Sequence, residues 1–155
     1  MITKQKAINI FEEILRDLSS LGSIFFHFLI IILLIPFFDT SFELIKLIVL
    51  NLLLSSLICY TIRLLYFTDR PVKRTFKTLL EKLDASSFPS AHVCRSFGLT
   101  VLSYQFENIY LIILLSFISL GISYSRIYFD CHHKRDVIFG AIIGVSIGYL
   151  ILLFA

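Results

Sequence analysis

The sequence contains no tryptophan, and its three cysteines are far apart. Without tryptophan, anchoring at a membrane surface would depend on tyrosine and on basic side chains. Cys59, Cys94 and Cys131 have none of the paired spacings that zinc sites or disulfide frameworks require. The cysteine pattern therefore predicts neither a zinc site nor a disulfide-rich fold.

A strong charge of either sign is also lacking. The formal net charge is +3, and the basic residues are concentrated in a few segments. We interpret them as flanks of membrane helices and as site residues, and we expect no nucleic-acid partner. No secretory signal peptide is expected, because the first apolar run follows about twenty residues of mixed charge and continues into a full span.

Apolar residues are abundant: 57% of the chain is hydrophobic, and the mean hydropathy is +0.89. Soluble domains contain about 45–50% apolar residues, so the composition predicts an integral membrane protein that crosses the bilayer several times. We expect one domain, residues 1–155, with an all-α fold. Its helical bundle should have about five transmembrane helices, at residues 21–38, 47–67, 90–106, 109–124 and 137–155.

Three further helical features accompany these spans. From Ala7 to Leu18 the apolar residues recur with helical spacing, which predicts an N-terminal amphipathic helix. Its acidic and basic charges cancel, so we expect it to lie at the interface or to pack on the bundle. The loop 68–88 should contain a short interfacial helix, and in the last span a close-packing stripe is formed by Gly140, Gly144 and Gly148.

Polar blocks interrupt the apolar sequence at residues 63–71, 89–92 and 125–136. The order of the predicted spans places all three blocks at the same end of the bundle. Ionisable residues that converge at membrane depth indicate a functional site. For the last block alone, the alternative is an ordinary charged loop between two spans.

The side chains in these blocks suit phosphate-ester hydrolysis. Planar, multidentate donors for a phosphoryl group would come from Arg63, Arg70 and Arg126. Ser90 and the N–H groups at the start of a helix add further donors. The arginines would repel a cation, so we expect neither a metal nor a cofactor.

Two histidines can divide the remaining chemistry. If the chain is helical from His132, Asp136 lies on the same face and can hold one imidazole nitrogen, which frees the other as a nucleophile. His92 has no carboxylate at a matching spacing and suits a general acid. His133 competes with His132 for the role of nucleophile, but on a helix it would point about 100° away.

The three blocks resemble the signature of the type 2 phosphatidic acid phosphatase (PAP2) superfamily. That signature consists of Lys, six residues, Arg-Pro; then Pro-Ser-Gly-His; then Ser-Arg, five residues, His, three residues, Asp. The third block matches at every fixed position, through Ser125, Arg126, His132 and Asp136. Arg63 replaces the usual Lys, and Ala91 replaces the usual Gly, which adds a methyl group beside the phosphate.

The resemblance implies a membrane phosphatase that acts on a lipid phosphate or a lipid pyrophosphate. It implies a phosphohistidine on His132, with Asp136 orienting that ring and His92 as the acid. The implied phosphate ligands are Arg63, Arg70, Ser90, Ala91 and Arg126. Alternatives are a phosphotransferase using the same site, a haloperoxidase, which is disfavoured because such members are soluble and much longer, and a non-catalytic membrane scaffold. The residues indicate no oligomeric state.

Basic residues also predict the orientation of the site. Apart from the site residues Arg63, Arg70 and Arg126, nine Lys and Arg residues fall on the side of the three blocks and only Lys46 falls on the opposite side. The positive-inside rule then places the site in the cytoplasm, although many members of the family are thought to work on the outer face.

Overall fold

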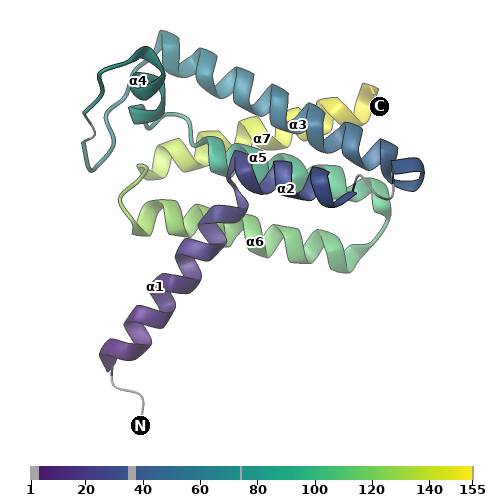
Figure 1. The fold of residues 1–155 in the computed structure, drawn as a ribbon, viewed down its shortest axis with the longest axis horizontal. Coiled ribbons are helices and arrows are strands. Elements are labelled where there is room, and N and C mark those ends of the chain that lie inside the picture. Colours follow the sequence, from purple (N-terminus) through teal and green to yellow (C-terminus); the bar gives the residue numbers. More distant parts are fainter. Residues whose placement is uncertain (1–3, 35–37, 74, 155) are drawn as a thin grey trace.

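The computed structural model describes residues 4–34, 38–73 and 75–154, and every regular element in those ranges is a helix. The all-α class expected from the sequence is confirmed (Figure 1). In chain order the elements are α1 (Lys4–Leu21), α2 (Ile24–Leu34), α3 (Phe38–Leu65), α4 (Leu79–Ala85), α5 (Ala91–Leu102), the 3-10 helix η2 (Ser103–Phe106), α6 (Ile109–Tyr128) and α7 (Lys134–Phe154).

Five of these helices correspond to the five expected spans, but two of them are short. By length and composition α3, α6 and α7 can each cross a membrane, and a bent α1–α2 pair could form a fourth span. The fold is therefore that of a membrane protein. Helix α2 has 11 described residues, and the Pro36 expected near its end lies outside the described residues.

Helix α5 occupies the middle of the bundle. It has 12 residues, or about 18 Å, and it contacts α3, α6 and α7. Eight of its residues are buried, and several of these are polar. Because neighbouring helices surround it, α5 does not need the length or the apolar surface of a helix that faces lipid.

The N-terminal helix packs against the second half of α6. The ring of Phe11 meets that of Tyr128 edge to face, with 5.8 Å between centroids, and Leu18 lies against Gly121. At residues 22–23 the chain bends by 67° into α2. From the sequence, this amphipathic helix was expected either at the membrane interface or packed on the bundle. The described contacts place it on the bundle.

The glycine stripe of α7 lies directly against α5. A Cβ atom on Gly144 would be 2.2 Å from the carbonyl oxygen of Cys94, and one on Gly140 would be 2.7 Å from that of Ser90. Side chains at these positions would push the two helices apart. The stripe therefore allows the backbones to touch, and it fixes the start of α7 beside the start of α5.

The loop between α3 and α5 contains the expected short helix, α4. Thr78 and Glu81 form a capping box at its start. The helix covers only residues 79–85, because the segment before Thr78 is not helical.

Candidate active site

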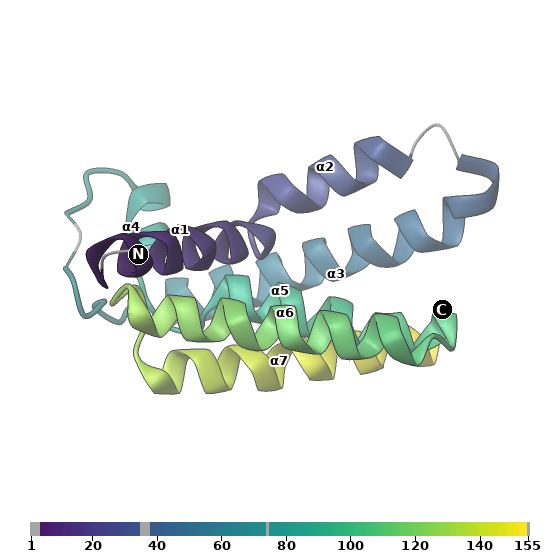
Figure 2. The same ribbon diagram turned by 90° about the horizontal axis from the view of Figure 1, so that it is seen from below.

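Four helix ends meet at one end of the bundle, which we call the site end (Figure 2). Helices α3 and α6 finish there, with Arg63 and Arg126 in their last turns. Helices α5 and α7 begin there, and the N–H of Ser90 donates to the carbonyl of Asp136 at 3.0 Å. The site end thus combines two arginines with two helix N-termini, an arrangement that favours anions.

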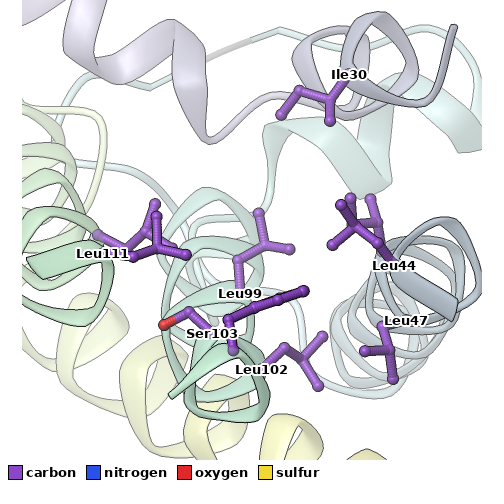
Figure 3. Close-up of a pocket in the computed structure, with 10 residues that line it drawn as sticks. Ile30, Leu44, Leu47, Leu99, Leu102, Ser103 and Leu111 are labelled. Carbon is purple, nitrogen blue, oxygen red and sulfur yellow. The ribbon is translucent and has the colours of Figure 1, made fainter. Parts of the chain in front are cut away.

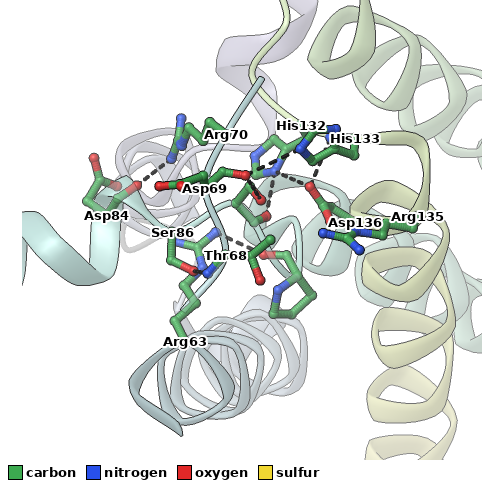
Figure 4. A network of polar contacts seen from close by, with 12 residues as sticks. Arg63, Thr68, Asp69, Arg70, Asp84, Ser86, His132, His133, Arg135 and Asp136 are labelled. Atoms are coloured by element: carbon green, nitrogen blue, oxygen red, sulfur yellow. Dashed lines mark hydrogen bonds and ion pairs between the residues drawn. The ribbon is translucent and has the colours of Figure 1, made fainter. Parts of the chain in front are cut away.

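His132 is buried in the loop before α7 (Figure 4). Its Nδ1 lies 2.7 Å from the carbonyl oxygen of Ser87. A carbonyl oxygen can only accept a hydrogen bond, so Nδ1 carries the proton and Nε2 keeps its lone pair. Burial, followed by the positive charges of Arg126, Arg70 and Arg63, lowers the pKa of His132 to about 2. The ring is therefore neutral at ordinary pH, as a nucleophile requires.

Asp136 lies beside His132, but the shortest polar contact of the His132 ring is the one with the carbonyl of Ser87. Its Oδ2 is 3.9 Å from Nδ1 of His132, and it accepts a hydrogen bond from the backbone N–H of His133 at 2.9 Å. The helix begins at Lys134, so His132 precedes it and is not helical as expected, although the two side chains are close together, as expected. Asp136 also caps α7 and places a negative charge beside the imidazole.

Arg63 is buried at the end of α3 and ties two segments of the chain together. One nitrogen of its guanidinium donates to the carbonyl of Leu83 at 3.2 Å, and the other donates to that of Pro89 at 2.9 Å. Its Nε is buried without a hydrogen-bond partner. Arg63 thereby fixes the start of the second polar block, and its Nε–H is left as a donor for a ligand.

The other predicted phosphate ligands gather around this point. Arg70 is buried and donates to the carbonyl of Asp84, while Arg126 donates to Oγ of Ser19 at 3.0 Å. The hydroxyl of Ser90 is buried with no hydrogen-bond partner. The methyl group of Ala91 lies in an apolar cluster with core side chains, so a phosphate contact there would come from its backbone N–H.

His92 stands in the first turn of α5 and is close enough to His132 for the two rings to interact electrostatically. A fourth arginine, Arg95, lies one turn further along and also acts on His92. Arg95 is buried, and its Nε donates to the carbonyl of Gly22 at 3.0 Å. Gly22 packs on His92, and a Cβ at Gly22 would be 3.0 Å from that of His92. Arg95 therefore holds the α1–α2 bend against the candidate acid.

Serine hydroxyls hold the acceptor for His132 in place. Oγ of Ser86 accepts from the N–H of Thr68 at 3.3 Å, and Oγ of Ser87 donates to the carbonyl of Asp69 at 3.0 Å. A backbone bond from the N–H of Ser87 to the carbonyl of Thr68 adds a third link. These bonds close the loop 68–87 and position the carbonyl of Ser87.

His133 differs from His132 in its exposure. Its side chain is exposed, and its Nε2 lies 3.3 Å from the carbonyl oxygen of Asp69. His132 is the buried histidine of the pair.

The structure brings all eight sequence-predicted residues to the site end, and it adds three that the sequence reasoning missed. These are Arg95, Ser19 and the carbonyl of Ser87. Arg95 had a usable signal, because it is an ionisable residue inside a predicted span. A backbone carbonyl and a serine in an amphipathic helix carry no such signal.

Comparison with known proteins agrees with this arrangement. The sequence model of the PAP2 superfamily matches residues 44–155, a range that contains all three polar blocks. The crystal structure of Aquifex aeolicus LpxE has the same fold: the TM-score is 0.76 at 24% sequence identity, over 92% of this chain and 86% of that one. No curated protein matches the sequence. With more than two thirds of its length matched by the family model, the chain belongs to the PAP2 superfamily.

Proposed function

We propose that this protein is a membrane phosphatase that hydrolyses a lipid phosphate or a lipid pyrophosphate through a phosphohistidine on His132. One observation carries the proposal. His132 is a buried, neutral imidazole whose Nδ1–H donates a hydrogen bond to the carbonyl of Ser87. The positive charges of three arginines act on this ring. A nucleophile in that setting suits an anionic phosphoryl group.

In the first step, Nε2 of His132 attacks phosphorus and a P–N bond forms. The bond between phosphorus and the leaving oxygen of the substrate breaks, and His92 donates a proton to that oxygen. A dianionic phosphoryl group would counter the arginine charges around His92 and so favour its protonated form. Asp136 would stabilise the positive charge that develops on His132.

In the second step, water attacks the phosphohistidine. His92, now neutral, takes a proton from that water, the P–N bond breaks, and inorganic phosphate leaves with His132 restored. Arg63, Arg70, Arg126, Ser90 and the first N–H groups of α5 would bind the phosphoryl oxygens in both steps.

Phosphate release should not require a divalent metal, and orthovanadate should inhibit it. Arginines neutralise the phosphoryl charge in this proposal, and vanadate imitates the transferred group. The assay uses purified protein with dioleoyl phosphatidate, farnesyl pyrophosphate and p-nitrophenyl phosphate, each with EDTA and with added Mg²⁺. Activity that is lost in EDTA and restored by Mg²⁺ would contradict the mechanism.

We propose further that the site end faces the cytoplasm, because nine basic residues outside the site lie on that side against Lys46 on the other. The exposed loop residue Lys77 offers a test. A Lys77→Cys variant that lacks the three native cysteines is treated in intact cells with a membrane-impermeant maleimide. Labelling only after lysis is expected, whereas labelling of intact cells would place the site outside.

A further inference from the structure

Two apolar cavities lie side by side between α2 and the rest of the bundle. The larger, about 360 Å³, is lined by residues of α2, α3, α5, η2 and α6, and Figure 3 shows Leu111 and Leu44 on opposite sides of it. The smaller, about 180 Å³, lies nearer the site end and continues to Leu21 and Ile122. Both are lined by Ile30, Leu99 and Leu115. The two cavities therefore adjoin, and we call them together the α2–α6 groove.

One end of this groove comes within one helical turn of the candidate active site. Ser96, which lines it, is one helical turn from His92, and Ile122 is one turn from Arg126. Leu21 lines it as well and precedes Gly22, the residue that packs on His92. From Ile122 to Leu111 on α6 the groove extends for about 16 Å. It therefore begins one helical turn from the proposed phosphate site and runs along much of the bundle.

The surface of the groove favours hydrocarbon. Its three serines turn their hydroxyls to nearby partners: Ser96 to the carbonyl of Val93, Ser103 to that of Thr100, and Ser119 to Oγ1 of Thr100. Among the residues that the structure describes, no charged side chain lines either cavity. A ligand in the groove would meet only apolar atoms and satisfied hydroxyls, which suits an alkyl or isoprenoid chain and disfavours a polar one.

We propose that the α2–α6 groove holds a hydrocarbon chain of the substrate while its phosphate lies at His132. This inference rests on the proposed phosphatase function. A second groove, between α3 and α7, lies far from the candidate active site. It is lined by Leu54, Leu150 and Phe154 among others. On α7, Leu150 is about 21 Å from Asp136. The two grooves thus provide a test and a matched control.

The test places tryptophan in each groove. Leu115→Trp should fill the α2–α6 groove, and Leu54→Trp should fill the control groove. For each variant, kcat/KM is measured with p-nitrophenyl phosphate, which has no chain, and with whichever of dioleoyl phosphatidate and farnesyl pyrophosphate the wild type hydrolyses faster. We expect Leu115→Trp to lower the ratio of lipid to chain-free kcat/KM by about tenfold or more, because several methylene groups lose their burial. Leu54→Trp should leave the ratio unchanged.

An unchanged ratio in Leu115→Trp, or an equal fall in Leu54→Trp, would overturn the inference but not the proposed function. A wild type inactive on every substrate would overturn both. A second measurement does not depend on a folded variant: wild-type protein is photocrosslinked with phosphatidate that carries a diazirine on its chain. Crosslinks in residues 24–34 or 111–122 that exceed those from the matching diacylglycerol support the inference, and crosslinks confined to α3 and α7 contradict it.

Discussion

Replacing His132 by alanine should abolish phosphate release, with a fall in kcat on the order of a million-fold, as for other removed nucleophiles. The variant loses the nitrogen that forms the covalent intermediate. His92 is the nearest candidate to replace it, but it lies on α5 and has no described acceptor that fixes its proton. Steady-state kinetics with p-nitrophenyl phosphate measure the effect.

His133→Ala is the matched control for this result. It removes the same side chain from the next position, where the ring is exposed and contacts the carbonyl of Asp69. We expect near-normal kcat/KM. An inactive His133→Ala together with an active His132→Ala would show that the roles of the two histidines are reversed.

Arg63→Ala should lower kcat/KM by a factor on the order of 10²–10³, the loss typical for one preorganised donor to a transition state. The change removes a buried guanidinium that bridges the carbonyls of Leu83 and Pro89. Those carbonyls lose their partner, so the thermal unfolding midpoint should fall as well. Arg63→Lys should have an intermediate effect, because an ammonium keeps the charge but cannot bridge both carbonyls in one plane.

Kinetics and thermal unfolding of Arg63→Ala are compared with those of Lys77→Ala, which removes a charge from the exposed part of the same loop. Lys77→Ala should match the wild type in both measurements. If Lys77→Ala were impaired as strongly, long-range charge would explain the Arg63 effect. A folded Arg63→Ala with normal kcat/KM would remove Arg63 from the site.

Counting apolar stretches was enough to place the three polar blocks at one end of the bundle, because each block adjoins the end of a span. The same counting did not indicate that α5 ends at Leu102. Its apolar residues continue through η2, and its shortness depends on being enclosed by other helices.

Motif spacing predicted eight residues that the structure gathers at the site end, but not all of their contacts. His132 and Asp136 are four residues apart, yet Nδ1–H of His132 donates its hydrogen bond to the carbonyl of Ser87, 45 residues away. Every residue has a backbone carbonyl, so the sequence does not show which one accepts this hydrogen bond. The folded loop does. The α2–α6 groove is equally invisible in the sequence, because its lining residues are those of any apolar helix.

The phosphohistidine on His132 is the central claim, and it can be trapped directly. Purified protein is mixed with ³²P-labelled lipid substrate, denatured in alkali within the first turnovers, digested, and analysed by mass spectrometry under conditions that preserve P–N bonds. The account predicts an acid-labile, alkali-stable phosphoryl group on His132 in the wild type and none in His132→Ala. A label on Ser90 or His133, or turnover without any labelled protein, would contradict it.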